Sequence, residues 1–187
     1  MSSQENGQVP VKIVGIDASL TSTGIAVSNG FNLRTATESI ESKLKGADRL
    51  IEIREKIREN IIFAGLVVLE DYAFSRPNQA HQIGELGGVL RVLIKEMGKK
   101  LLTVGTMQLK KFATGKHNAS KEEIAVAAYK KWGIECRTND ETDAAVLVYI
   151  GLAYMGNTDG LTAYQQEVID ALYGKSEVKK KRKKKGE

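Results

Sequence analysis

Residues 11–27 of the chain read VKIVGIDASLTSTGIAV and decide how the rest of the sequence is interpreted. An apolar, β-branched run ends at Asp17, and small and hydroxylated residues then lead into a second apolar run. This pattern is typical of a strand, a tight turn and a second strand. Asp17 is the only charged side chain between Lys12 and Arg34. An acid at the end of a buried strand either caps the turn or binds a metal ion.

The composition is typical of one intracellular globular domain. The chain has 187 residues, of which 42% are hydrophobic and 27% charged. No apolar run approaches the ~20 residues needed to span a bilayer, and the opening MSSQENGQ does not resemble a secretory signal. We therefore expect no membrane contact and a location in the cytoplasm of a bacterial or phage-infected cell, or in the nucleus if the source is eukaryotic or viral. The single cysteine excludes an internal disulfide.

Positive charge is concentrated at the C-terminus. The run KKKRKKK at 179–185 carries seven positive charges against a net charge of +5, so the remainder sums to −2. We expect a flexible N-terminus over 1–10, one domain over 11–174 and a disordered basic tail over 175–187. Such a tail either binds a polyanion through counterion release or serves solubility or nuclear localisation, and the sequence leaves these readings open.

Hydrophobic patterning predicts an α/β fold with a mixed sheet of five strands flanked by helices. Three antiparallel strands come first, over 11–17, 23–28 and 31–37, and the last two are joined by the hairpin signal Asn29-Gly30. The continuous apolar runs at 65–71 and 101–105 are typical of buried parallel strands. Helices are expected over 45–60, 79–97, 107–113, 121–132, 140–155 and 162–173, with a capping box of Ser120 and Glu123 before the fourth.

Four carboxylates stand at the ends of these elements, namely Asp17, Glu70, Asp140 and Asp143. Ligands of α/β sheets bind beyond the carboxyl ends of strands, so Asp17 and Glu70 meet there if their strands are neighbours. Four oxygen donors suit Mg²⁺ or Mn²⁺ rather than zinc, and two such ions roughly 4 Å apart would promote phosphodiester hydrolysis. Each acid taken singly is also explained as a helix N-terminal charge or a polar strand end. Whether Glu70 or Asp71 faces the ions stays open.

The order of these motifs resembles the RuvC family of Holliday-junction resolvases, within the RNase H-like superfamily. The resemblance covers about residues 11–155. Five segments carry it: VGIDASLTSTGIAV, LVVLEDYAF, GELGGVLRVLI, QLKKFATGKHNASKEEI and NDETDAAVLV. The helix after Gly160 and the basic tail are not part of the family pattern, which would fit a phage or viral branch of the family.

The resemblance implies an RNase H-like fold and a homodimer that cuts two strands of a four-way DNA junction symmetrically. It implies two Mg²⁺ or Mn²⁺ ions per active site and no small-molecule cofactor. Asp17, Glu70, Asp140 and Asp143 would be the metal ligands, with Lys121 as a further catalytic residue. The family also inserts an aromatic wedge into the junction, and the matching position is Ala73. The expected DNA contacts are Lys110, Lys116, Lys121, Arg76, Tyr72 and Phe74, with His117 as a further phosphate contact.

Three other functions remain open. Asp17 followed by Ser, Thr and Gly also resembles the phosphate loop of actin-like ATPases and sugar kinases, which use two such domains where this chain has one. A nuclease of broader branched-DNA or RNA–DNA hybrid range would use the same acids. A non-catalytic junction-binding protein is disfavoured, because clustered carboxylates repel phosphate unless metal is bound.

Overall fold

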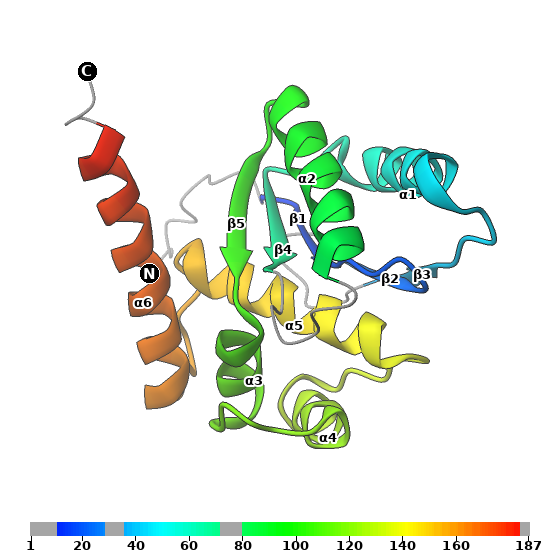
Figure 1. Cartoon of the computed structure of the whole chain (residues 1–187). Helices are drawn as coiled ribbons and strands as arrows, with labels where there is room; N and C mark the ends of the chain where they lie inside the picture. The colour runs from blue at the N-terminus through cyan, green and yellow to red at the C-terminus, as the bar shows by residue number, and fades with distance from the viewer. Residues whose placement is uncertain (1–10, 29–35, 72–79, 184–187) are drawn as a thin grey trace, which may run out of the picture.

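The computed structural model describes residues 11–28, 36–71 and 80–183, without the side chains of residues 36, 80–83 and 175–183. This part of the chain forms five strands and six helices (Figure 1). Among the helices described, none is both long and apolar enough to cross a membrane. In chain order the elements are β1 (Ile13–Asp17), β2 (Thr23–Ser28), β3 (Ala36–Ile40), α1 (Gly46–Ile61), β4 (Leu66–Glu70), α2 (Ala80–Glu96), β5 (Lys100–Val104), α3 (Thr106–Thr114), α4 (Lys121–Trp132), α5 (Asn139–Tyr154) and α6 (Ala163–Lys183).

One mixed sheet joins the five strands in the order β3-β2-β1-β4-β5. β2 pairs antiparallel with β1 and β3, whereas β4 pairs parallel with β1 and β5, so the predicted mixed sheet is confirmed. Residues 13–16 and 66–69 are buried because these central strands are covered on both faces. The register pairs Ile16 with Leu69. The residues that follow them, Asp17 and Glu70, therefore lie side by side at the carboxyl edge of the sheet.

The third strand ends further along the chain than predicted. The expected strand was 31–37, whereas β3 begins at Ala36 and ends at Ile40, and residues 31–35 lie outside the described part. The hydroxyl groups of Thr37 and Ser39 both donate hydrogen bonds to the carboxylate of Glu141 on α5, at 3.2 and 3.0 Å. This strand is polar, and its hydroxyl groups are held by a buried acid that is far away in the sequence. It therefore lacks the apolar pattern by which a strand is predicted.

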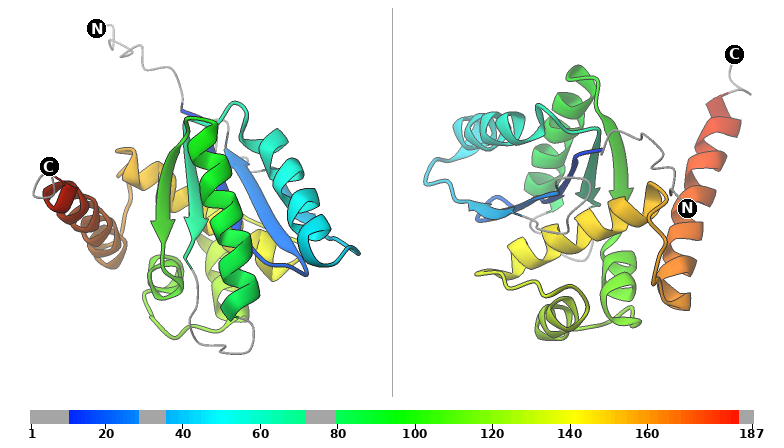
Figure 2. Two further views of the ribbon diagram at one scale, coloured as in Figure 1. Left: turned by 45° about the horizontal axis from the view of Figure 1, so that its top comes forward. Right: turned by 180° about the vertical axis from the view of Figure 1, so that it is seen from behind.

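The sheet separates two hydrophobic cores. α1 and α2 cover one face, where Ile53, Ile57 and Leu90 share a core with Val14 and Val67 of the sheet. α5 crosses the other face, and α3, α4 and α6 pack around it. Figure 2 shows this division from two sides, with α5 on the opposite face of the sheet from α1 and α2. The active-site candidates lie where α5 meets the strand ends.

α5 lies close to β1 and β2 because glycines face it. A Cβ on Gly15 would lie 2.2 Å from the carbonyl oxygen of Ala144, and a Cβ on Gly24 would lie 2.1 Å from the carbonyl oxygen of Asp140. No side chain fits at such distances, so glycine is required at both positions. Gly24 is also the register partner of Asp17. The close contact therefore sets the start of α5 beside the carboxylate that ends β1.

α6 is longer than predicted. The sequence predicted an end near Tyr173, whereas the helical backbone continues to Lys183. The first half of the helix is anchored by Val168, Ile169 and Leu172, which are all buried. Lysine, arginine and glutamate are good helix formers, so a charged segment without apolar periodicity can extend a helix that packing has already anchored.

Candidate active site

Three carboxylates meet at the carboxyl edge of the sheet. Asp17 ends β1, Glu70 ends β4 and Asp143 lies near the start of α5. One oxygen atom from each of the three lies within 4.8 Å of the other two. The parallel pairing of β1 with β4 brings the first two together, and the close approach of α5 to β2 adds the third. The structure thus brings together three of the four predicted acids; we call these three the acidic cluster.

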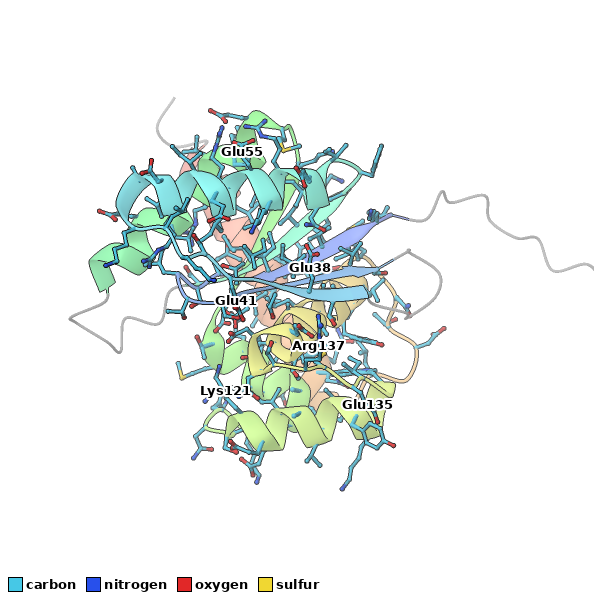
Figure 3. All side chains as sticks on the ribbon, turned by 90° about the vertical axis from the view of Figure 1, so that its right-hand side faces the viewer. Glu38, Glu41, Glu55, Lys121, Glu135 and Arg137 are labelled. Atoms are coloured by element: carbon cyan, nitrogen blue, oxygen red, sulfur yellow. The ribbon has the colours of Figure 1, made fainter. Side chains whose placement is uncertain are left out.

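Asp140 lies at the rim of the acidic cluster. Its Oδ1 atom is 3.4 Å from Nζ of Lys121, and the same Nζ is 3.9 Å from Oδ2 of Asp143. Lys121 is the first residue of α4, whose N-cap Ser120 forms the predicted capping box with Glu123. Figure 3 shows Lys121 at this end of α4, on the side of the sheet that α5 covers. The lysine therefore bridges the two acids that α5 contributes.

Glu70 faces the acidic cluster, and its neighbour Asp71 does not belong to it. Successive residues of a strand point to opposite faces of the sheet. Oδ1 of Asp71 accepts a 2.9 Å hydrogen bond from the guanidinium of Arg91 on α2. Oε1 of Glu70 accepts a 2.6 Å hydrogen bond from the hydroxyl of Thr106, the first residue of α3. Of the two acids, Glu70 is therefore the one whose carboxylate lies in the acidic cluster.

Burial and crowding shift the protonation equilibria of the site. The pKa of Asp17 lies well above its ordinary value, chiefly through burial and also because Glu70 and Asp143 repel its charge. Burial, followed by the charge of Glu70, raises the pKa of Asp143 to about 7, although Lys121 opposes the shift. Burial would lower the pKa of Lys121, but the charges of Asp143, Asp140 and Asp17 together raise it. A cation among these acids would relieve both the repulsion and the burial of unpaired charge.

The donor set fits a hard divalent cation. Carboxylate oxygens are the ligands that Mg²⁺ and Mn²⁺ prefer in proteins, and three of them converge here within 4.8 Å. The cluster found among the described residues consists of carboxylates alone, whereas zinc sites use histidine and cysteine. Asp17, Glu70 and Asp143 are therefore the residues that fit a bound ion, and Asp140 lies near enough to influence it electrostatically.

The turn after Asp17 is closed by its own hydroxyl groups. Oγ1 of Thr23 donates a 2.6 Å hydrogen bond to the carbonyl oxygen of Ser19 and accepts one of 3.2 Å from the amide of Ser19. Oγ of Ser19 accepts a further hydrogen bond of 3.3 Å from the amide of Thr21. Serine and threonine thus cap this turn. The carboxylate of Asp17 is therefore not needed to cap the turn and belongs to the acidic cluster. This favours metal binding over turn capping as the reason for an acid at this strand end.

The predicted phosphate-contacting lysines lie on three consecutive segments: Lys110 on α3, Lys116 in the loop after it and Lys121 at the start of α4. The positive charge of Lys110 on α3 opposes the rise in the pKa of Asp143, so this lysine acts on the acidic cluster. Lys116 is exposed and lies 2.7 Å from Oε1 of Glu123, and His117 is exposed beside it. Lys121 therefore lies at the rim of the cluster and Lys110 acts on it electrostatically, while Lys116 and His117 are exposed on the surface. The predicted contacts Tyr72, Phe74 and Arg76 lie outside the described residues.

Two polar residues near the cluster were not predicted from the sequence. Thr106 follows β5, a partly buried edge strand that ends at the edge of the sheet where acids were expected, and this weak signal was overlooked in the sequence. Glu141 is only 1% exposed and accepts hydrogen bonds from Thr37, Ser39 and the amide of Arg137. Figure 3 shows Arg137 next to the start of α5. Because the partners of Glu141 on β3 are about a hundred residues away in sequence, no local pattern could reveal its role.

Comparisons with known proteins point to RuvC. No protein-family model matches the chain. The curated crossover junction endodeoxyribonuclease RuvC of Synechococcus sp. (strain WH7803) is 24% identical over 150 residues, which cover 75% of this chain and 97% of the relative. A RuvC structure from Thermus thermophilus matches with a TM-score of 0.63 and 25% identity, over 78% of this chain and 97% of that one. T. thermophilus RuvC in complex with a Holliday junction substrate matches with a TM-score of 0.65 and 24% identity, over 78% and 96%.

The fold and the site define an α/β protein of the RNase H-like superfamily with an acidic centre at the carboxyl edge of its sheet. Within that superfamily the chain is RuvC-like, as its motifs indicated, and the comparisons support a nuclease. The matched RuvC chains are covered almost completely. About a fifth of this chain lies outside the structural matches, which cover 78% of it.

Proposed function

We propose that this chain is a divalent-metal-dependent endonuclease that resolves Holliday junctions by paired, symmetric nicks. The observation that carries the proposal is the meeting of Asp17, Glu70 and Asp143 at the carboxyl edge of a RuvC-like fold. Three converging carboxylates destabilise a fold in the absence of a cation, which argues for a role beyond structure. The substrate class is suggested by the relatives, one a crossover junction endodeoxyribonuclease and another solved with a Holliday junction substrate.

In the proposed active site the three acids of the cluster hold Mg²⁺ or Mn²⁺, and Asp140 completes the ligand set. When bound, two such ions activate a water molecule and stabilise the leaving oxygen of the phosphodiester. Asp17 would be the central ligand of this set, because it shares the cluster with Glu70 and Asp143 and the charge of Asp140 also acts on it. A carboxylate on which the charges of all the other acids act lies at the electrostatic centre of the site.

Lys121 and Lys110 are the proposed phosphate contacts. The side chain of Lys121 is half exposed, and its raised pKa keeps the ammonium charged at neutral pH. A phosphate that reaches the acidic cluster meets this cation at the rim, where it stabilises the negative charge that develops on the phosphate oxygens in the transition state. The contact would extend to flanking DNA through Lys116, Arg76, Tyr72 and Phe74.

We also propose that the chain acts as a homodimer, because two symmetric nicks require two active sites. α2 exposes 56% of Val92. A Cβ added at Gly88 of the same helix would meet nothing within 4 Å, so the surface around this residue is open. An exposed apolar side chain on an open helix face suits contact with a second copy. Sedimentation at micromolar concentration tests this proposal, and a monomer would count against it.

A synthetic four-way junction tests the proposed function. With Mg²⁺ we expect paired nicks at symmetric positions, and we expect Asp17→Asn to bind the junction without cutting it. Asp71→Asn is the matched control, because Asp71 pairs with Arg91 outside the acidic cluster and its variant should cut normally. Equally fast cleavage of linear duplex or RNA–DNA hybrid would indicate a broader nuclease. Junction binding without cleavage would indicate a binding protein, and Mg²⁺-dependent ATP hydrolysis would indicate a kinase-like one.

A further inference from the structure

Thr106 is a half-buried hydroxyl residue beside the acidic cluster, and the proposed function gives it no role. It is the first residue of α3 and follows the end of β5 by two positions. Its Oγ1 donates a hydrogen bond of 2.6 Å to Oε1 of Glu70, which ends the neighbouring strand β4. This length is typical of a hydroxyl bound to a carboxylate. The bond therefore joins the start of α3 directly to one of the three clustered acids.

The backbone around Thr106 is fixed by contacts other than this hydrogen bond. The amide of Asp71 donates a 2.7 Å hydrogen bond to the carbonyl oxygen of Val104, which continues the pairing of β4 with β5. The amide of Gly105 donates to Oε1 of Gln108 at 3.1 Å, and the amide of Gln108 donates back to the carbonyl oxygen of Gly105 at 2.8 Å. The backbone that carries the threonine hydroxyl is thus fixed by hydrogen bonds to both the sheet and the helix.

Glu70 needs such a tether more than the aspartates of the cluster do. A glutamate has one more rotatable bond than an aspartate, so it loses more side-chain freedom when its carboxylate is fixed. When both are ionised, Glu70 and Asp17 also repel each other, which favours orientations in which the two carboxylates turn apart. A donor on the neighbouring strand-helix junction opposes both tendencies, because the hydrogen bond forms only while Glu70 stays at the cluster.

We propose that Thr106 is a positioning residue whose hydroxyl holds the Glu70 carboxylate in the orientation that binds a divalent cation. This inference rests on the proposed function, since the cation belongs to the proposed active site. α3 also carries Lys110, so the residue that orients Glu70 is part of the helix that presents a proposed phosphate contact. Partners that orient metal-binding side chains contribute about 10–100-fold to metal affinity in other proteins.

Binding of Mn²⁺ to the full chain without DNA, measured by isothermal titration calorimetry, tests this inference. We expect Thr106→Val, which keeps the shape and removes the hydroxyl, to weaken Mn²⁺ binding by about 10–100-fold. Thr106→Ser keeps the hydroxyl and should bind Mn²⁺ as the unsubstituted chain does. Thr114→Val is the matched control at the other end of α3, where the Thr114 hydroxyl donates to the carbonyl oxygen of Lys110 at 2.8 Å, and it should leave Mn²⁺ binding unchanged.

A double-mutant cycle with Glu70→Gln separates positioning from general structural damage. In the Glu70→Gln background, Thr106→Val should have no further effect on Mn²⁺ affinity, because the hydroxyl acts through Glu70. If Thr106→Val does not fold, Thr106→Ala takes its place in the same comparisons. Unchanged Mn²⁺ affinity in the folded variant overturns this inference alone. Failure of the unsubstituted chain to bind Mn²⁺ overturns the proposed function as well.

Discussion

Replacing Asp143 with asparagine should stabilise the metal-free protein above neutral pH, although it removes a proposed metal ligand. Asp143 is 8% exposed, and its pKa is raised from 3.8 to about 7. A carboxyl whose pKa is raised on folding binds more protons in the folded state than in the unfolded state, so stability falls as pH rises between the two values. Stability from the protonated acid is fully present below pH 3.8 and is lost by about pH 7. Asparagine cannot ionise and does not incur this loss.

The magnitude follows from the separation of the two pKa values. Each pH unit between them removes about 1.4 kcal/mol from the free energy of unfolding per carboxyl. Between pH 5 and the folded-state value of about 7, Asp143 therefore accounts for a loss of about 3 kcal/mol. Asp17, whose pKa is also raised, adds in the same direction. The variant loses the ionic contact with Lys121, but this contact is long, at 3.9 Å, and the lysine is half exposed to solvent, so it contributes at most about 1 kcal/mol.

Urea unfolding in EDTA at pH 5 and pH 8 measures this effect. With a slope of about 2 kcal/mol per molar urea, the Asp143 contribution lowers the midpoint of the unsubstituted chain by about 1.5 M, a loss that Asp143→Asn should avoid. Added Mg²⁺ at pH 8 should stabilise the unsubstituted chain more than the variant. Asp71→Asn, outside the acidic cluster, should keep the pH dependence of the unsubstituted chain. Equal pH dependence in Asp143→Asn and the unsubstituted chain would refute the reasoning.

Two further predictions concern the packing of α5 and the basic end of α6. Gly24→Ala should lower the free energy of unfolding by about 2 kcal/mol or more, because its Cβ would lie 2.1 Å from the carbonyl oxygen of Asp140. Gly88→Ala, with nothing within 4 Å of its Cβ, should be neutral or stabilise by up to about 1 kcal/mol; equal loss in both variants by thermal unfolding would contradict the packing argument. Deleting residues 175–187 should weaken junction affinity and flatten its dependence on salt without abolishing cleavage of saturating substrate. An unchanged salt slope would exclude this segment from DNA binding.

The fold was predictable where the pattern that specifies an element lies within the element itself. β1 and β4 are apolar on both faces, and Ser120 and Glu123 form the capping box of α4 from residues close in sequence. The end of β3 was predicted wrongly because the hydroxyl groups of this strand bind Glu141 of α5, which is about a hundred residues away in sequence. The end of α6 was misplaced for a related reason. Its charged residues have no amphipathic pattern, and the anchoring of the helix at Val168 lies upstream of them.

The acidic cluster was predictable as residue types at element ends, but its contacts were not. Asp17 and Glu70 both follow apolar runs, and neighbouring parallel strands must end at the same edge. The choice between Glu70 and Asp71 depends on the direction of each side chain at the end of β4, and the contacts that fix these directions, with Thr106 and Arg91, are distant in sequence. The hydroxyl of Thr106 carries no sequence signal strong enough to link it to Glu70. That contact depends on the pairing of β4 with β5.

The same close packing that assembles the acidic cluster also destabilises the ionised form of its aspartates. Gly24 lets α5 approach the end of β1, and this approach buries Asp143 beside Asp17. Burial is the largest cause of the raised pKa of both Asp17 and Asp143, so holding these carboxylates close lowers the stability of the fold. A bound cation would recover that stability, because metal ions displace protons from carboxylates and neutralise them together. The proposed metal binding, the pH-dependent stability and the glycine contacts therefore have a common origin in the packing of α5 against the carboxyl edge of the sheet.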